Sequence, residues 1–324
     1  MKAATCRRYG SPDVLAIETL EIPKPKRGEV LVRVTNSTVT SGDTRLRGFR
    51  GPRLFWLPLR LAFGLFRPRQ PITGMEFAGE IVALGPAVKG MNLGDRVFGL
   101  KIGGANAEYV TAKAKAALAH CPSRVSDELC AATPFGALSA LSFVRDIAQV
   151  RPGERLLIHG ASGAVGVFAV QLAKILGAHV TAVCSARNAE MVAELGADRV
   201  LDYASPDFRL EPETYDVILD TVGATRFSRC RHALVATGRH VFAEVDGGRL
   251  LQSVWTSFRP GPRVLCGFSA GDSLEDLTLI AQYLDRGVLR PVIDRCYALD
   301  QIVEAHRYVE LGRKRGAVVI RIAE

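Results

Sequence analysis

The fold is indicated most clearly by Gly160-Ala-Ser-Gly163-Ala-Val-Gly166, which joins an apolar run at 156–159 to a run of helical periodicity at 165–176. Glycine permits a tight turn and lets the backbone approach a phosphate, whose oxygens then face the free N–H groups of the helix start. A glycine pattern alone also fits a plain strand-to-helix turn. The strand before it and the helix after it predict a dinucleotide-binding turn.

Strand and helix patterns alternate on both sides of this turn. Strands are predicted at 180–184, 198–201, 217–220, 239–242 and 264–268, and helices at 188–195 and 227–234. Alternation at this spacing predicts βαβ units and a doubly wound parallel sheet, and therefore an α/β fold.

The first 120 residues carry a different pattern. Apolar and β-branched runs at 1–7, 29–35, 77–84 and 96–100 alternate with turn signals, which predicts a barrel or sandwich. Between the two halves, 127–150 has a helical pattern, with Ser126 as its N-cap and a break at Pro134 and Gly136. The tail holds helical patterns at 274–286 and 299–311 and a last strand at 317–322, a segment that could return to the first domain.

The end of the strand at 180–184 bears on the kind of nucleotide. An NAD site carries a carboxylate about 20 residues after the glycine turn, but this strand is followed by Ser185 and Arg187. The Ser185 hydroxyl can hydrogen-bond a 2′-phosphate, and the Arg187 guanidinium can bind it with charge-assisted hydrogen bonds. Arg187 could also be a solvated residue of a helix start. We predict NADPH as the preferred cofactor.

Composition bounds the class of protein. The 324 residues, 48% of them hydrophobic, suit two domains at about 100–200 residues each. The seven cysteines form no C-x-x-C pair, and 1–11 is not typical of a signal peptide, so we expect a cytoplasmic protein with reduced thiols. The net charge of +9 includes no long basic run, and nucleic-acid binding is not expected.

Further motifs extend over nearly the whole chain: Gly74-Met-Glu-Phe-Ala-Gly79, Gly94-Asp-Arg-Val97, Pro134-Phe-Gly-Ala-Leu-Ser-Ala140, Leu195-Gly-Ala-Asp198 and Asp220-Thr-Val-Gly223. With them the chain resembles the medium-chain dehydrogenase/reductase superfamily, in its zinc-free quinone oxidoreductase-like branch. The resemblance implies a GroES-like β-barrel catalytic domain at 1–122, a Rossmann domain at 123–264, and a C-terminal segment at 265–324 that rejoins the barrel.

The resemblance also implies the cofactor contacts, each of which could instead be ordinary packing. They are Ala164 and Val165 in the turn, Tyr203 at the adenosine phosphate, Val222 and Gly223 at the adenine and ribose, and Ser139, Cys266, Gly267 and Phe268 near the nicotinamide. They complete the candidate cofactor site inferred from the residues themselves, which consists of Gly160, Ser162, Gly163, Gly166, Ser185 and Arg187.

Zinc chemistry is not expected. Alcohol dehydrogenases of this superfamily bind zinc through Cys, His and Cys, and the matching positions here are Thr40, Met75 and Phe135, which are poor ligands. Hydride transfer without a Lewis acid needs an electrophilic acceptor, so we predict NADPH-dependent reduction of a quinone, enone or enal. An NADP-linked alcohol or carbonyl dehydrogenase and a non-catalytic NADPH-binding protein are the alternatives.

The candidate catalytic groups lie in the loop at 38–45. Thr40 or Ser41 could donate a hydrogen bond to the developing oxyanion. Asp43 could act in catalysis, or it could be a structural carboxylate that fixes the loop, with Arg45 as its partner. Many relatives carry an asparagine and a tyrosine in this loop, so the proton donor stays open.

The segment 48–73 is apolar and rich in arginine. It could be a lid over a small hydrophobic substrate, a subunit contact or surface loop, or a peripheral membrane contact, and we favour a lid or contact over the membrane. The resemblance further implies a homodimer, with the strand at 264–268 as the candidate edge.

Overall fold

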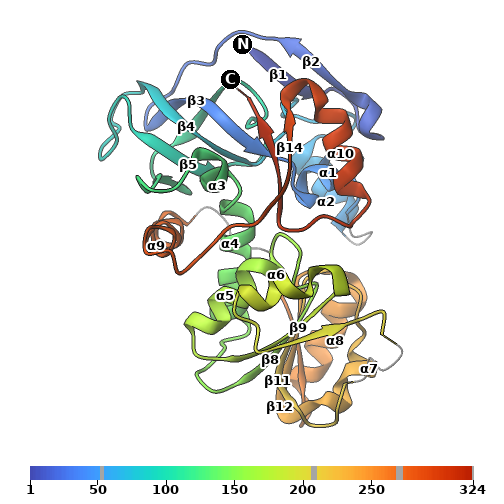
Figure 1. Ribbon diagram of the computed structural model, residues 1–324. Coiled ribbons are helices and arrows are strands. Elements are labelled where there is room, and N and C mark those ends of the chain that lie inside the picture. Colours follow the sequence, from blue (N-terminus) through green and yellow to red (C-terminus); the bar gives the residue numbers. More distant parts are fainter. Residues whose placement is uncertain (52–54, 206–209, 268–272, 323–324) are drawn as a thin grey trace. The chain divides into compact units, whose positions relative to one another are not determined.

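The computed structural model describes residues 1–51, 55–205, 210–267 and 273–322, which form two compact units (Figure 1). The first unit comprises 1–51, 55–135 and 273–322, and the second comprises 136–205 and 210–267.

The first unit is built on a mixed sheet in the order β14-β15-β3-β4-β5-β7, with β6 also paired to β3. Its strands are β3 (Glu29–Thr38), β4 (Glu76–Leu84), β5 (Arg96–Leu100), β6 (Tyr109–Lys113), β7 (Leu118–His120), β14 (Ile293–Ala298) and β15 (Ala317–Arg321), beside a hairpin of β1 (Lys2–Cys6) and β2 (Leu15–Thr19). Val32, Phe77 and Val97 are fully buried in its core, as the alternating pattern of these strands requires.

The tail joins this first sheet. β15 pairs antiparallel with β3, with Val319 opposite Thr38, and β14 pairs parallel with β15. In Figure 1 the red C-terminal strands lie with the blue and teal strands from the start of the chain. The helices of the unit are α1 (Ser41–Gly48), α2 (Trp56–Phe63), α3 (Asp127–Ala131), α9 (Leu274–Asp285) and α10 (Ile302–Glu310).

The second unit is a parallel sheet in the order β10-β9-β8-β11-β12-β13. Its strands are β8 (Arg155–His159), β9 (His179–Cys184), β10 (Arg199–Asp202), β11 (Tyr215–Asp220), β12 (Leu234–Phe242) and β13 (Arg263–Cys266), and its helices are α5 (Gly166–Ile175), α6 (Ala189–Glu194), α7 (Phe227–Cys230) and α8 (Gly247–Ser257). In chain order this is the doubly wound Rossmann arrangement, with its switch point between β8 and β11. The predicted parallel α/β sheet is confirmed.

The domain boundaries lie later than predicted. α3, expected in the second domain, packs on β3, β4 and β5, and Asp127 accepts a hydrogen bond from Thr35 Oγ1 (2.8 Å) and pairs with Arg96. β13, expected partly in the C-terminal segment, is a strand of the second sheet. Helical or strand periodicity shows that an element forms but not which sheet it joins, which explains both corrections.

The predicted helix at 127–150 is three elements: α3, α4 (Pro134–Leu141) and a π-helical turn at Ser142–Ile147. Ser126 caps α3 as predicted, accepting from the N–H of Leu129. Gly136 does not break the chain but lies inside α4, where a Cβ atom would come within 2.4 Å of Ala164 O. This glycine is therefore required by close packing.

Candidate cofactor site and active-site loop

The turn at 160–166 follows β8 and leads into α5, as predicted. Gly160 has a φ of +81°, and a Cβ atom there would lie 2.6 Å from Val222 Cγ1. A Cβ atom on Gly166 would lie 2.2 Å from Gly160 O, which is backbone of the turn itself. Gly163 differs, because its Cβ atom would meet only Gly160 O, at 3.3 Å. Two of the three glycines are thus fixed by the geometry of the turn.

The N-terminus of α5 suits an anion. Val165 is its N-cap residue and makes no side-chain cap hydrogen bond. The first N–H groups of a helix have no intrahelical partner, and the helix dipole favours negative charge beside them. Ala164 and Val165 stand at this end of α5, and the contact of their amides with a pyrophosphate stays a prediction.

Asn188 links the glycine turn to the end of β9, and it was missed in the sequence. Its Nδ2 donates to Ser162 Oγ (3.0 Å) and to Ser185 Oγ (3.2 Å). Since both hydroxyl oxygens accept from Asn188, their own hydrogens remain for another acceptor. Its Oδ1 is buried and has no partner among the described residues, so a ligand hydroxyl would satisfy it. An asparagine three residues after Ser185 was the available signal.

Arg187 and Tyr203 lie at the ends of adjacent strands. Arg187 is exposed in the single turn after β9, and the Tyr203 N–H donates to Cys184 O (3.3 Å) while 55% of the residue is exposed. The neighbouring strand β10 ends with Asp202, which lies opposite Cys184 and accepts from the N–H of Ala204 (3.0 Å). Because no acid directly follows β9, no adjoining carboxylate would repel a 2′-phosphate bound by Ser185 and Arg187.

The turn after β11 is shaped by the buried Asp220. Its Oδ1 accepts from the N–H groups of Val222 (3.0 Å) and Gly223 (2.8 Å), and its Oδ2 accepts from the Thr225 N–H (2.7 Å). Burial alone would raise the pKa of Asp220, but these hydrogen bonds and that of the Thr225 hydroxyl hold it below its ordinary value. Val222 and Gly223 are thereby held beside Gly160, at the carboxyl edge of the sheet.

The residues that were predicted near the nicotinamide lie in different surroundings. Ser139 is buried in α4, one turn after Gly136, and thus on the side of α4 that approaches the glycine turn. Cys266 ends β13, where burial raises the pKa of its thiol to about 11. A Cβ atom on Gly267 would lie 2.0 Å from Ile147 Cδ1, so a larger residue there would displace the end of the Ile147 side chain. Phe268 lies outside the described residues.

In the first unit, Thr40 and Asp43 form a capping box at the start of α1. Thr40 Oγ1 accepts from the Asp43 N–H (3.1 Å) and donates to Asp43 Oδ2 (2.6 Å). Asp43 also accepts from the N–H groups of Thr40 (2.8 Å) and Gly74 (3.1 Å). These bonds match the structural role considered for Asp43 and engage the Thr40 hydroxyl. Ser41, which is only partly buried, remains as the candidate donor.

The positions that match the zinc ligands of alcohol dehydrogenases lie beside this box. Met75 Sδ is 3.8 Å from Thr40 Oγ1, and the Phe135 N–H donates to Glu76 Oε1 (2.6 Å). Among the described residues, no three His, Cys, Asp or Glu side chains gather as a metal site. A hydroxyl, a thioether and a phenyl ring are not a zinc ligand set.

Two buried carboxylates each contribute a stability that falls as pH rises. Burial raises the pKa of Asp43 to about 6 and that of Glu76 to about 7, above their values in an unfolded chain. At these two groups the folded protein binds more protons than the unfolded chain between about pH 4 and about pH 7, so their contribution to the free energy of unfolding decreases through this window. Burial lowers the pKa of His240 to about 4 and that of His306 to about 3, and these histidines contribute in the opposite direction.

We expect the melting temperature of Glu76→Gln to rise relative to that of the wild type as pH increases from about 5 to about 7.5, because only the wild type loses the proton bound at Glu76. Thermal melts of both proteins at each pH test this. A difference between the two melting temperatures that does not change with pH would show that Glu76 does not titrate in this range.

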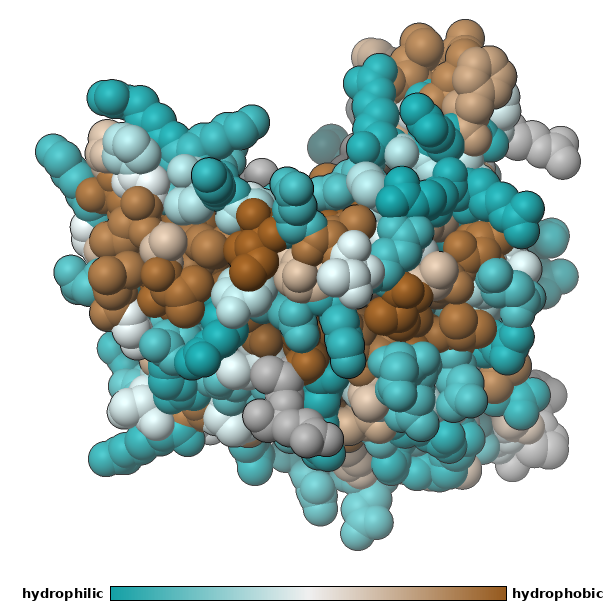
Figure 2. All heavy atoms as spheres, turned by 90° about the horizontal axis from the view of Figure 1, so that it is seen from above, coloured by the Kyte–Doolittle hydropathy of each residue, from teal (hydrophilic) through white to brown (hydrophobic). Residues whose placement is uncertain are grey.

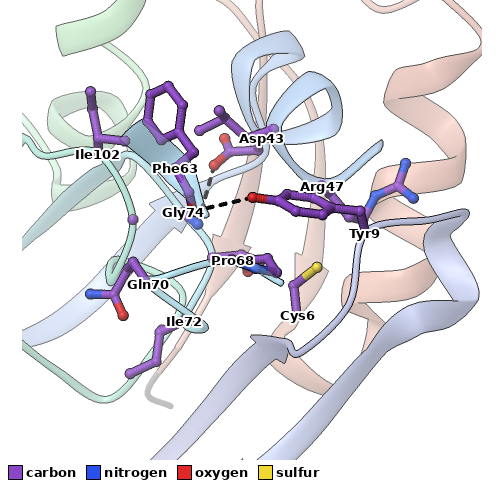
Figure 3. Close-up of a pocket in the computed structure, with 13 residues that line it drawn as sticks. Cys6, Tyr9, Asp43, Arg47, Phe63, Pro68, Gln70, Ile72, Gly74 and Ile102 are labelled. Carbon is purple, nitrogen blue, oxygen red and sulfur yellow. Dashed lines mark hydrogen bonds between the residues drawn. The ribbon is translucent and has the colours of Figure 1, made fainter. Parts of the chain in front are cut away.

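A cavity of about 70 Å³ lies within the first unit, behind Asp43 (Figure 3). Leu46, Phe63 and Ile102 are among its apolar lining residues. The Tyr9 hydroxyl donates to the carbonyl oxygens of Phe63 (3.1 Å) and Gly64 (2.9 Å), which fastens the covering segment. Part of 48–73 thus covers a small cavity, and the lid stays one of the interpretations of this segment.

A Rossmann unit with an open glycine turn, joined to a mixed-sheet unit, defines a dinucleotide-dependent oxidoreductase. Residues 26–123 match the family model described as alcohol dehydrogenase GroES-like domain, and residues 195–320 match that described as zinc-binding dehydrogenase. The chain belongs to the medium-chain dehydrogenase/reductase superfamily, with the quinone oxidoreductases. Both the predicted family and the predicted fold, a GroES-like domain plus a Rossmann sheet, are confirmed.

Individual relatives extend over the whole chain. The 2-methylene-furan-3-one reductase of Solanum lycopersicum is 30% identical over 99% of this chain and 79% of its own length. The quinone oxidoreductase from Coxiella burnetii is 27% identical with a TM-score of 0.86, covering 100% of this chain and 99% of that one. A mycobacterial protein solved in complex with NADPH is 25% identical with a TM-score of 0.81, covering 99% and 100%. The chain is thus similar to NAD(P)H-dependent oxidoreductases throughout.

Proposed function

We propose that this protein reduces a quinone, enone or enal by hydride transfer from NADPH, without zinc. The observation that carries the cofactor preference is the end of β9, where Ser185 and Arg187 stand without an adjoining acid and Asn188 leaves the Ser185 hydrogen available. A 2′-phosphate would accept from that hydroxyl and from the Arg187 guanidinium. The NADPH complex of the mycobacterial relative supports this preference.

The residues of the chain supply binding and orientation. Bound NADPH supplies the hydride, and the glycine turn and the N-terminus of α5 would hold its pyrophosphate. Thr40, Met75 and Phe135 offer no zinc ligand set, so the acceptor must already be electrophilic. The Ser41 hydroxyl is left to hold the developing oxyanion. Relatives named as quinone and furanone reductases support acceptors of this type.

The direct test follows NADPH oxidation with a quinone, an enal and a simple ketone, on protein whose zinc content has been measured. We expect turnover with the quinone or the enal, little with the ketone, and no stoichiometric zinc. Ketone reduction by a zinc-loaded protein would replace this proposal with an alcohol or carbonyl dehydrogenase. Tight NADPH binding without turnover of any acceptor would favour a non-catalytic role.

The capping box gives the hydroxyls of Thr40 and Ser41 different expected roles in the active-site loop. We expect Ser41→Ala to lower kcat about 100-fold with little change in melting temperature, because one oxyanion donor is lost. Thr40→Val is expected to cost about 1 kcal/mol of stability through the lost cap, whereas Thr40→Ser keeps it. Kinetics and thermal melts of the three variants distinguish these effects, and unchanged turnover in Ser41→Ala would remove Ser41 from the mechanism.

We also propose a homodimer through the second unit. β13 is one of the two edge strands of that sheet, and α8 packs on it while exposing Leu251 and Trp255, with Phe258 exposed directly after the helix. An edge strand beside exposed apolar side chains suits a twofold contact. Light scattering on the purified protein should give twice the mass of one chain. A cytoplasmic location is proposed with it, supported by seven cysteines that are all unpaired thiols.

A further inference from the structure

Helix α2 and the residues that follow it form an ordered segment of the first unit. The Arg60 guanidinium lies over the rings of Tyr9 (4.3 Å) and Phe49 (4.0 Å) and donates to Leu65 O (2.8 Å). The Tyr9 hydroxyl also holds Gly64 O (2.9 Å). These contacts fix the inner side of the segment, so its outer side is presented in a defined arrangement.

The outer side is apolar and exposed. α2 has no buried residue, and the large apolar side chains that remain exposed are Trp56 (45%), Leu57 (55%), Leu61 (56%), Leu65 (42%) and Phe66 (86%). Figure 2 shows hydrophobic side chains gathered in patches between hydrophilic ones on one face of the molecule. Five large apolar side chains exposed within 56–66 indicate an interaction surface. A lid role accounts for Phe63, which lines the cavity, but not for these outward residues.

The charge of this segment has one sign. The segment 55–71 has no Asp or Glu and three arginines, Arg60, Arg67 and Arg69. Arg67 and Arg69 follow the apolar set in sequence, and with Arg7, which is paired with Glu18, they line a hollow of about 400 Å³. The lining residues of that hollow include no acid. The surface therefore pairs large apolar side chains with positive charge.

We propose that the segment 55–71 docks the protein on an anionic lipid surface. The five outward apolar side chains would enter the interface, and Arg67 and Arg69 would pair with lipid phosphates. A second copy of the chain would bring the same arginines to a twofold contact, where like charges would oppose each other. Within the described ranges, no helix has both the length and the apolar character needed to cross a bilayer.

The test is sedimentation with vesicles of phosphatidylcholine alone and of phosphatidylcholine with phosphatidylserine, at low and high salt. We expect binding only to the anionic vesicles, weakened by salt because the attraction is screened. Arg67→Gln with Arg69→Gln should lower the partition coefficient roughly 30-fold. Leu57→Ser with Leu61→Ser should lower it by about tenfold or more.

Matched controls come from the same unit. Leu93→Ser with Leu311→Ser removes two leucines that are 64% and 65% exposed, and Arg27→Gln with Arg124→Gln removes two exposed charges outside the segment. Both controls should bind vesicles as the wild type does. Equal losses in test and control variants, or no wild-type binding to anionic vesicles at low salt, would overturn the proposal.

Two further readouts separate the alternatives. If the segment joined two copies of the chain, Leu57→Ser with Leu61→Ser would lower the mass measured by light scattering, and the wild type would not bind vesicles. These results would also overturn the proposal. Turnover without vesicles should be unchanged in the arginine and leucine variants, because none of these residues lines the cavity or the cofactor site. A loss of that turnover would instead indicate a lid.

Discussion

Gly166→Ala is expected to weaken NADPH binding by about 100-fold or more. The added Cβ atom would lie 2.2 Å from Gly160 O and 2.7 Å from Ala161 Cα, both backbone atoms of the turn that is to hold the pyrophosphate. Backbone cannot rotate away as a flexible side chain can, so the turn must change shape and its amides lose their alignment with the phosphate. Fluorescence titration with NADPH measures the loss.

Gly163→Ala is the control for this effect. It adds the same methyl group three residues earlier in the turn, where the nearest atom is Gly160 O at 3.3 Å. We expect its NADPH affinity to stay within a few-fold of the wild type and its melting temperature to change little. Equal losses in both variants would mean that the turn tolerates no methyl group at any position. Full affinity in Gly166→Ala would remove this turn from the cofactor site.

Arg187→Ala is expected to lower the preference for NADPH over NADH by about 10- to 100-fold. A charge-assisted hydrogen bond contributes about 1.5–3 kcal/mol, and this one would be made only to the 2′-phosphate. The effect should therefore fall on NADPH and leave NADH almost unchanged. Steady-state kinetics with both cofactors and one good acceptor give kcat/KM for each.

Arg226→Ala serves as the matched control, because Arg226 is also an exposed arginine of the second unit but follows β11 rather than β9. Its selectivity ratio should equal that of the wild type. If Arg187→Ala and Arg226→Ala behave alike, Arg187 is a solvated residue of a helix start, and the assignment of NADPH loses its main support.

Local patterns predicted the second unit well. A buried parallel strand is a short apolar run in the sequence, and the helices between such strands have a hydrophobic period of about 3.6 residues. The predicted bounds of β8, β9, β11 and α5 are therefore close to the observed ones. The first unit was predicted less completely. β2, β6, β7 and β14 were missed because strands of three to six residues with one exposed face carry little periodic signal.

Site residues show the same contrast. The glycine turn and Ser185 were readable because each requirement is local in the chain. Asn188 was missed, since its role depends on Ser162, which lies 26 residues earlier and meets it only in the folded sheet. The buried Glu76 and its contact with the Phe135 N–H likewise join segments 59 residues apart.

The Rossmann sheet and its dinucleotide turn follow from the amino-acid sequence, because strand, turn and helix succeed one another and need only nearby residues. Which side chains are engaged in hydrogen bonds follows only from the folded structure. In it Thr40 and Asp43 cap α1, and Asn188 joins the glycine turn to the end of β9. The folded structure also leaves one side of 55–71 exposed, because burial depends on contacts that distant segments make only after folding.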